Sequence, residues 1–213
     1  MDLVDRHGSW RYIQDIPPAT LLTGADVANA AGAVRAARGV LVQLQQPPPV
    51  ALAVARQARS ADRLVVLDGA PTDPAVADDL LAAADVLRAD AREARLLTGA
   101  DLTDADAALR AGRDLLRRGP RLVALAVDGV GNVFVWPDRS LVVPLSDTGV
   151  VDTTGAGDAF VAALTAGLLR GDEPEHLARY AVAAAGTSVG HPGGRPDLSG
   201  PAIDAQLARI PAT

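Results

Sequence analysis

The chain has 213 residues, is 49% hydrophobic but only 3% aromatic, and carries a net charge of −6 from 20 basic and 26 acidic residues, which argues against a nucleic-acid or anionic-membrane surface. It contains no lysine and no cysteine, which excludes a P-loop lysine, a Schiff-base lysine, a disulfide framework, a zinc–thiolate site and a cysteine nucleophile. Because no apolar run is long enough to span a membrane and the acidic start Met1-Asp2 is no signal peptide, we expect one cytoplasmic domain over residues 1–213 with a core of Ala, Leu and Val.

Short strands and longer helices are predicted in alternation along the chain. Residues 1–16 are expected to form a β-hairpin that turns near Gly8, and Pro17-Pro18 ends it. Short apolar runs predict strands at 40–44, 64–67, 86–87, 122–127, 133–136 and 141–143. Helical spacing and end signals predict helices at 24–38, 50–60, 74–84, 90–98, 104–118, 155–169, 174–189 and 201–209.

Two of these helices have a sequence signal at their start. Thr23 is followed three residues later by Asp26, and Thr103 by Asp106, which is the spacing of a capping box. The run at 40–44 is continuous and apolar, as expected of a buried parallel strand. The alternation of strands and helices predicts an α/β layered domain with a mostly parallel sheet, in which ligands bind at the carboxyl ends of the strands.

A glycine-rich stretch, residues 152–158, runs from a loop into an Ala-rich helical segment. Glycine lets the backbone lie close to a ligand, and the first turn of a helix has N–H groups without an intrahelical partner. The amides of Gly155, Ala156 and Gly157 are therefore candidates for an anion site. Asp158 lies beside them, where a carboxylate could take a proton from a nucleophile that attacks a phosphate. The alternative is that Asp158 only faces the helix dipole.

The stretch Asp152-Thr153-Thr154-Gly155-Ala156-Gly157-Asp158 resembles the D-T-x-G-A-G-D signature of the ribokinase-like (PfkB) carbohydrate and nucleoside kinases. The resemblance implies a three-layer α/β/α domain with a mostly parallel central sheet, and ATP-dependent phosphorylation of a sugar hydroxyl. It implies Asp158 as the catalytic base that faces the substrate, with the three amides stabilising the charge of the transferring phosphoryl group. The expected partner is a small sugar or nucleoside, and no nucleic acid or membrane is expected.

Residues 64–99 resemble the family's central strand, loop and helix. Where the family usually has Asn-x-x-Glu near magnesium and the phosphates, this chain has Asp90-Ala91-Arg92-Glu93. The resemblance implies that Asp90 lies near the nucleotide and Glu93 near Mg²⁺. Two carboxylates at this spacing share a helix face and can order magnesium waters. A solvated helix N-terminus is the alternative.

Residues 126–131 resemble the family's Thr-x-Gly-x-x-Gly stretch along the nucleotide, with the last glycine kept and Asp128 where glycine is usual. Otherwise this segment is only a hairpin turn. Val182 lies where ribokinases often have Asn or His beside the adenine, which implies an apolar wall. The nucleotide contacts that the resemblance implies come from Asp90, Ala126, Asp128, Gly129, Gly131, Gly157 and Val182.

The loop of residues 188–197 resembles the family's closing loop, which binds a monovalent cation together with the start of the signature. Oxygen-only ligation suits a hard cation such as K⁺. As a side chain, His191 is interpreted instead as an exposed loop histidine. The cation ligands that the resemblance implies are Asp152, Thr154, the carbonyl oxygens of Ser188, His191 and Gly193, and a side-chain oxygen of Asp197.

The segment 42–47 resembles the family's strand end Leu-Gln-Leu-Glu-x-Pro, which implies that Gln45 faces the sugar; a polar strand terminus is the alternative. The resemblance begins partway into the family, so its lid and its Gly-Gly-x-x-x-Asn sugar motif are expected to have no counterpart. Two further functions therefore stay open. One is a degenerate homologue that binds nucleotide without kinase activity. The other is a chain whose site is completed by a partner, for example in a homodimer, since an unpaired first strand invites pairing.

Overall fold

The computed structural model describes residues 2–4, 10–13, 15–146, 148–194 and 197–211. In this part of the chain, six strands form one sheet, and each strand lies beside the one that precedes it in sequence. The first four strands are parallel and the last two run antiparallel, so the prediction of a mostly parallel sheet is confirmed. The strands are β3 (Gly39–Gln43), β4 (Leu64–Asp68), β5 (Val86–Ala89), β6 (Leu122–Val127), β7 (Gly131–Val135) and β8 (Ser140–Val143).

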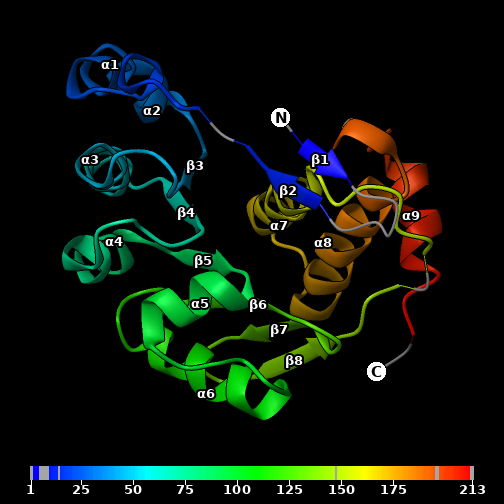
Figure 1. Cartoon of the computed structure of the whole chain (residues 1–213). Helices are drawn as coiled ribbons and strands as arrows, with labels where there is room; N and C mark the ends of the chain where they lie inside the picture. Colours follow the sequence, from blue (N-terminus) through cyan, green and yellow to red (C-terminus); the bar gives the residue numbers. More distant parts are fainter. Residues whose placement is uncertain (1, 5–9, 14, 147, 195–196, 212–213) are drawn as a thin grey trace.

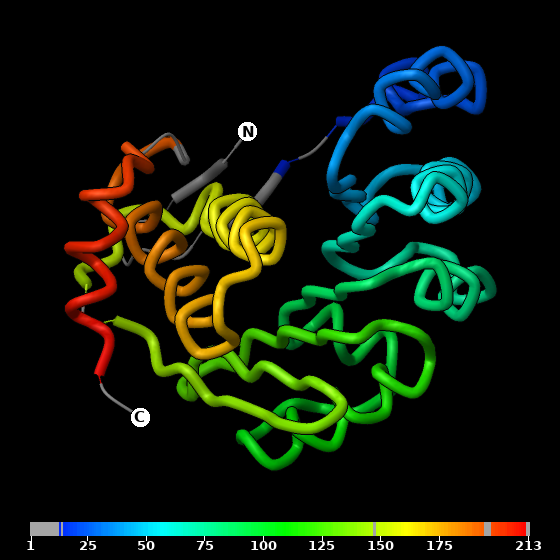
Figure 2. The backbone as a smooth tube through the Cα atoms, turned by 180° about the vertical axis from the view of Figure 1, so that it is seen from behind, coloured from blue at the N-terminus to red at the C-terminus, as the bar shows by residue number. Residues whose placement is uncertain are grey.

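Helices cover both faces of this sheet, as Figures 1 and 2 show from opposite sides. One face carries α3 (Pro48–Ser60), α4 (Ala77–Ala83), α5 (Ala91–Thr98) and α6 (Ala105–Leu116). The other carries α7 (Ala156–Arg170), α8 (Pro174–Val189) and α9 (Gly200–Leu207). The three-layer α/β/α architecture is therefore confirmed. Short 3-10 turns lie at Pro18–Thr20, Pro74–Val76 and Pro192–Gly194.

The alternation of side chains along the central strands builds two separate cores. Val65 and Leu67 of β4 pack toward α3 and α4, while Val66 between them packs toward α7 and α8. Phe134 of β7 and Phe160 of α7 stack in the second core with ring centroids 5.7 Å apart. This packing fixes the start of α7 against the ends of the strands.

The strand β3 differs from its prediction in burial. It is parallel to β4, as expected, but it is the edge strand of the six, and Leu41 is 46% exposed. Only its face toward α3 is buried, through Val42 and the partly buried Val40. An apolar run cannot reveal whether a strand lies at the edge or in the middle of a sheet, because both need the same apolar face.

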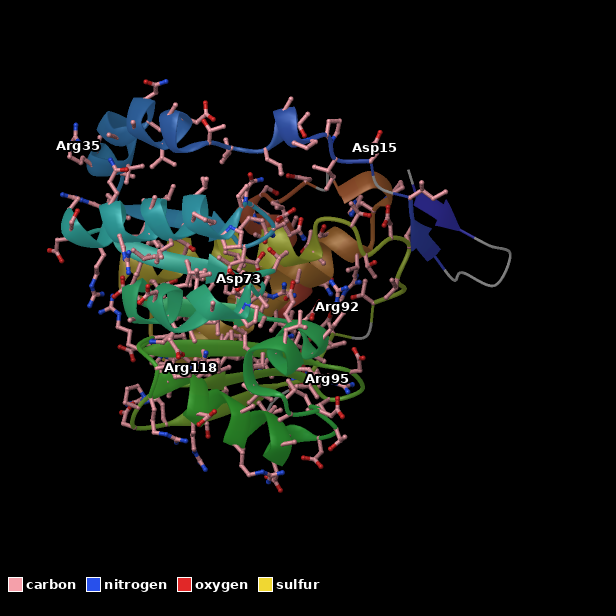
Figure 3. All side chains as sticks on the ribbon, turned by 60° about the vertical axis from the view of Figure 1, so that its left-hand side comes forward. Asp15, Arg35, Asp73, Arg92, Arg95 and Arg118 are labelled. Atoms are coloured by element: carbon pink, nitrogen blue, oxygen red, sulfur yellow. The ribbon has the colours of Figure 1, made fainter. Side chains whose placement is uncertain are left out.

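The helix predicted at 24–38 is interrupted. The capping box of Thr23 and Asp26 is confirmed, with the Thr23 amide donating to the Asp26 carboxylate at 2.8 Å. The chain then leaves the helix at Ala30, so that α1 (Gly24–Asn29) and α2 (Ala31–Ala36) are separate segments, both packed on α3. Farther along, Arg118 (Figure 3) binds the Leu97 carbonyl oxygen and so joins the end of α6 to α5.

The start of α6 was assigned to the wrong residue by the sequence pattern. Asp104, not Thr103, is the N-cap, and its carboxylate accepts a hydrogen bond of 2.7 Å from the amide of Ala107. Thr103 and Asp106 have the spacing of a capping box, but the carboxylate of Asp104, the next residue, is an equally good cap and occupies the N-cap position.

We expect Asp104→Ala to lower the melting temperature by several degrees, because the Ala107 amide loses its acceptor. The hydrogen bond from Ala107 lowers the pKa of the Asp104 carboxyl below its ordinary value of 3.8. The stability that this hydrogen bond adds to the folded protein is therefore full above pH 3.8 and is lost as the pH falls through the lowered pKa. Thermal melts at about pH 7 and about pH 3 measure both effects. Thr103→Ala is the matched control, and a larger loss in this control than in Asp104→Ala would contradict the assignment.

The first strands form a separate hairpin. β1 (Asp2–Val4) pairs antiparallel with β2 (Trp10–Tyr12), and the predicted turn near Gly8 lies outside the described residues. Within the described ranges, no helix has both the length and the apolar character that a membrane-spanning segment needs.

Candidate active site

The N-terminus of α7 meets the carboxyl ends of the parallel strands. α7 packs on β3 and β4, and Gly157 in its first turn lies against β5: a Cβ atom on Gly157 would be 3.3 Å from Nη1 of Arg88. Asp158, the next residue, is exposed and close enough for its negative charge to raise the pKa of the Asp68 carboxyl. The glycine-rich stretch and the strand ends therefore form one site.

A buried ion pair lies at the centre of this site. Asp68 ends β4 and is only 6% exposed. Its Oδ1 is 3.1 Å from Nη1 of Arg88 on β5, and its Oδ2 accepts a hydrogen bond of 3.0 Å from the side-chain amide of Gln43 at the end of β3. Glu93 of α5 approaches the same Arg88 nitrogen at 3.8 Å.

Sequence reasoning missed Asp68, Arg88 and Gln43 as site residues. The signal was present, because each is a polar residue at or near the carboxyl end of an otherwise apolar strand. In a parallel sheet those ends lie side by side at the ligand-binding edge.

Burial controls the electrostatics of the two carboxyls in this cluster. Desolvation raises the pKa of Asp68, although the Arg88 guanidinium acts in the opposite direction. Desolvation likewise raises the pKa of Glu93, and the neighbouring charges of Asp90 and Asp68 add to it. A site that holds acidic groups away from water in this way stabilises a cation placed between them.

The backbone amides of the glycine-rich turn differ in whether they donate a hydrogen bond within the protein. Gly155 adopts a left-handed conformation, φ 76°, and the amide of Ala156 donates to the Thr153 carbonyl at 3.3 Å. Ala156 was predicted to contribute a free amide, and this hydrogen bond corrects that expectation. Among the hydrogen bonds of the described residues, none uses the amide of Gly155, Gly157 or Asp158, so three donors remain at the helix start.

A cavity of about 250 Å³ opens beside this turn, between α7, α8 and the ends of β6 and β7. Ala126, Gly157 and Val182, all predicted to contact a nucleotide, line it together. Arg88 also lines it, so the cavity is continuous with the ion-pair cluster. The remaining lining includes Asn132, Leu145, Ser146, Thr148, Val150, Thr153, Phe160 and Val189.

Asp128, Gly129 and Gly131 do not line the cavity: Asp128 and Gly129 lie in the turn between β6 and β7, and Gly131 begins β7. Gly131 has a φ of 122°, and a Cβ atom on it would collide with the Val143 carbonyl of β8. Glycine is therefore required there by the sheet itself, and the predicted nucleotide contacts of these three residues stay predictions.

Asp90 and Glu93 cap α5 reciprocally. The Asp90 carboxylate accepts from the Glu93 amide at 2.7 Å, and the Glu93 carboxylate accepts from the Asp90 amide at 2.8 Å. Arg92 between them points outward on α5 (Figure 3). Glu93 still has a second oxygen, Oε1, near Gly69, which a Cβ at that glycine would approach to 3.2 Å. This oxygen and the adjacent Asp68 suit a magnesium ion that keeps most of its waters.

Most of the predicted cation ligands come together through hydrogen bonds between the two loops. The two carboxylate oxygens of Asp152 accept the amides of Thr154 and Gly193 at 2.9 and 2.8 Å. The Thr154 carbonyl accepts the Ser188 hydroxyl, and the Ser188 carbonyl accepts the His191 amide. Asp197 caps the turn before α9 through Ser199. These contacts bring the loop of residues 188–193 to the start of the glycine-rich stretch, and cation binding there stays a prediction.

Gln45, predicted to face the sugar, lies exposed in the turn after β3. Gln43, two residues earlier, contacts Asp68 instead. Over the described ranges, no set of three or more His, Asp or Glu side chains is arranged to hold a metal ion. A magnesium ion would therefore depend on water and on phosphate oxygens for most of its ligands.

The pattern of the pfkB family carbohydrate kinases matches residues 15–199 of the chain. A ribokinase from Arabidopsis thaliana is 30% identical over 169 residues, which are 78% of this chain and 44% of that protein. A bifunctional ribokinase/ribose-5-phosphate isomerase A from Fructilactobacillus sanfranciscensis is 31% identical over 147 residues, which are 69% of this chain and 27% of that protein. The chain thus spans less than half the length of these relatives.

Solved structures share the fold over nearly the whole chain. A structure of Arabidopsis thaliana ribokinase complexed with ribose and ATP has a TM-score of 0.78 and 25% identity, and the match covers 97% of this chain and 67% of that one. Phosphofructokinase-2 from Escherichia coli in complex with potassium has a TM-score of 0.78 and 18% identity, covering 95% of this chain and 67% of that one. At that identity the second likeness concerns the fold alone.

Proposed function

The chain belongs to the pfkB family of carbohydrate kinases, and we propose that it transfers the terminal phosphoryl group of ATP to a hydroxyl group of a sugar or nucleoside. One observation carries the proposal. The unused amide of Gly157 lies against Arg88 and lines a largely apolar cavity, and the unused amide of Gly155 and the carboxylate of Asp158 belong to the same turn. Phosphoryl transfer needs this combination of positioned donors, a cation and a base.

The proposed reaction is an in-line displacement. The carboxylate of Asp158 accepts the proton of the acceptor hydroxyl as its oxygen forms a bond to the γ-phosphorus. The bond between that phosphorus and the bridging oxygen breaks, and ADP leaves with the electron pair. The amides of Gly155 and Gly157 and the guanidinium of Arg88 stabilise the charge on the transferring group.

A magnesium ion would be held by Glu93 with Asp68 nearby, largely through its waters, and would supply neutralisation of the phosphate oxygens. Asp90 would act on this site indirectly, by fixing the start of α5 and the position of Glu93. The raised pKa of Glu93 and Asp68 supports this placement, because a nearby cation stabilises the charged form of both groups.

A coupled assay of ATP consumption over a panel of sugars and nucleosides tests the proposal. We expect consumption in magnesium buffer to rise with one class of acceptor, since Asp158 needs a hydroxyl to deprotonate. Potassium is varied in the same assay, because the loops that would hold it do meet. Calorimetric titration with ATP runs beside it, and absence of both binding and consumption would contradict the proposal.

The same measurements separate the two other functions. ATP binding without a response to any acceptor supports a nucleotide-binding homologue without kinase activity. A particle larger than one chain, measured by mass in solution, supports completion of the site by a partner; a strict monomer that turns over counts against it. The exposed edge of β3 is where an added strand would pair.

A further inference from the structure

We propose that Asn132 selects the base of the bound nucleotide: its side-chain amide oxygen accepts a hydrogen bond from the 6-amino group of adenine, and its NH2 group donates one to the neighbouring ring nitrogen. The inference rests on the proposed function, because it takes the cavity beside the glycine-rich turn to be the nucleotide site. It adds a specificity-determining residue to that site.

The first argument is the burial of an unpartnered amide. Asn132 is 7% exposed, and it lines the 250 Å³ cavity. Among the described residues, its side chain has no hydrogen-bond partner. In the part of the chain that the structure describes, the buried side-chain atom without a partner is Arg63 Nε, so the polar atoms of Asn132 are not enclosed by protein but face the open cavity. An amide held in this way is explained if a ligand supplies the missing partners.

The second argument is the direction in which the strand presents this side chain. Val133 and Val135 of β7 belong to the core toward α5 and α6, and Phe134 to the core toward α7 and α8. By the alternation of a strand, Asn132 shares the face of Phe134. It pairs in the ladder with Ala126, which lines the same cavity. A neighbouring strand therefore supports the amide on the ligand side.

The third argument is that three other polar side chains of the cavity, those of Ser146, Thr148 and Arg88, are committed. The side-chain nitrogen of Gln206 is bonded to the hydroxyls of Ser146 and Thr148, and Arg88 is paired with Asp68. The rest of the wall includes the apolar Phe160 and Val182. A largely apolar slot with a free side-chain amide is suited to a flat heterocycle that is read along one edge.

The size and chemistry of the slot favour adenine. The cavity lies just below the roughly 300–1,000 Å³ of sites for drug-sized ligands, so it suits a base whose phosphates extend toward Gly157 and Arg88. A carboxamide has an acceptor and a donor side by side. Adenine offers the complementary donor and acceptor in its 6-amino group and adjacent nitrogen, and a good bidentate pair of this kind discriminates by about 1–3 kcal/mol.

The test compares nucleotide binding in the intact chain and in three variants, by calorimetry without an acceptor sugar. The probes are ATP, GTP and purine riboside triphosphate, which lacks the 6-amino group. We expect the unaltered protein to bind ATP roughly 10- to 100-fold more tightly than the other two. Asn132→Leu should abolish most of this preference, and Asn132→Asp, which keeps the acceptor but not the donor, should give an intermediate value.

Asn29→Leu is the matched control, because it makes the same change at an exposed residue of α1 that does not line the cavity; its preference for ATP should be unchanged. Equal binding of ATP and purine riboside triphosphate by the unaltered protein would overturn the inference without needing any variant to fold. Retention of the full preference in a folded Asn132→Leu would overturn it as well. Absence of binding by every nucleotide would instead overturn the proposed function on which it rests.

Discussion

Asp158→Asn is expected to lower the rate of ATP-dependent phosphorylation by roughly 10²- to 10⁴-fold, while the affinity for ATP is unchanged. The asparagine keeps the size and polarity of the side chain but cannot take the proton of the acceptor hydroxyl. The effect should therefore fall on kcat and not on ATP binding, and the steady-state assay combined with calorimetry measures the two separately.

Asp106→Asn provides the control for this prediction. Asp106, like Asp158, is an exposed acid in the first turn of a helix, but α6 lies on the opposite face of the sheet. If Asp158 only faced the helix dipole, both variants would lose a little stability and neither would lose turnover. Full turnover in Asp158→Asn would remove this residue from the mechanism.

Arg88→Met is expected to reduce turnover by roughly 10²- to 10³-fold, the cost of removing one group that stabilises transition-state charge. It also leaves the buried Asp68 without its cation, and breaking a buried pair costs roughly 3–5 kcal/mol in the free energy of unfolding. The hydrogen bond from Gln43 and the raised pKa of Asp68, which favours its neutral form, keep the loss toward the lower end.

A second substitution separates these two effects. In the double variant Arg88→Met with Asp68→Asn, no unpaired charge remains buried, so most of the stability should return. Its turnover should stay well below that of the single variant Asp68→Asn, which measures the loss due to Asp68 alone. Denaturant unfolding and the kinase assay measure the two outcomes. Recovery of turnover together with stability would show that Arg88 acts only through folding. Arg56→Met is the control, because Arg56 and Asp79 form an exposed pair worth little.

Much of the fold could be predicted because its determinants are local. Apolar runs marked the strands β3 to β8, and caps such as Thr23 with Asp26 marked helix starts. The sequence pattern was insufficient where two adjacent residues could both cap a helix. Asp104, and not the predicted Thr103, is the N-cap of α6. The edge position of β3 could not be predicted either, because it depends on which strands are beside it and not on its own residues.

The candidate site could be located from the sequence where one continuous stretch carries the motif, and less so where the sheet assembles it. The turn at Gly155–Asp158 is a local motif. Arg88, Asp68 and Asn132 come from three strands, and only the order of those strands brings them to one edge. A polar residue inside an apolar strand is the signal that would have identified all three, since such a residue needs a reason to be buried.

The strand order also affects the stage of folding at which the proposed site can form. From β4 onward each strand pairs with its predecessor, so the sheet can grow by contacts between segments that are close in sequence. The reactive groups do not share this locality, because Asp158 approaches Asp68 only when α7 returns across the sheet to β3 and β4. The residues of the proposed site therefore come together only when α7, which follows all six strands in sequence, packs against the sheet.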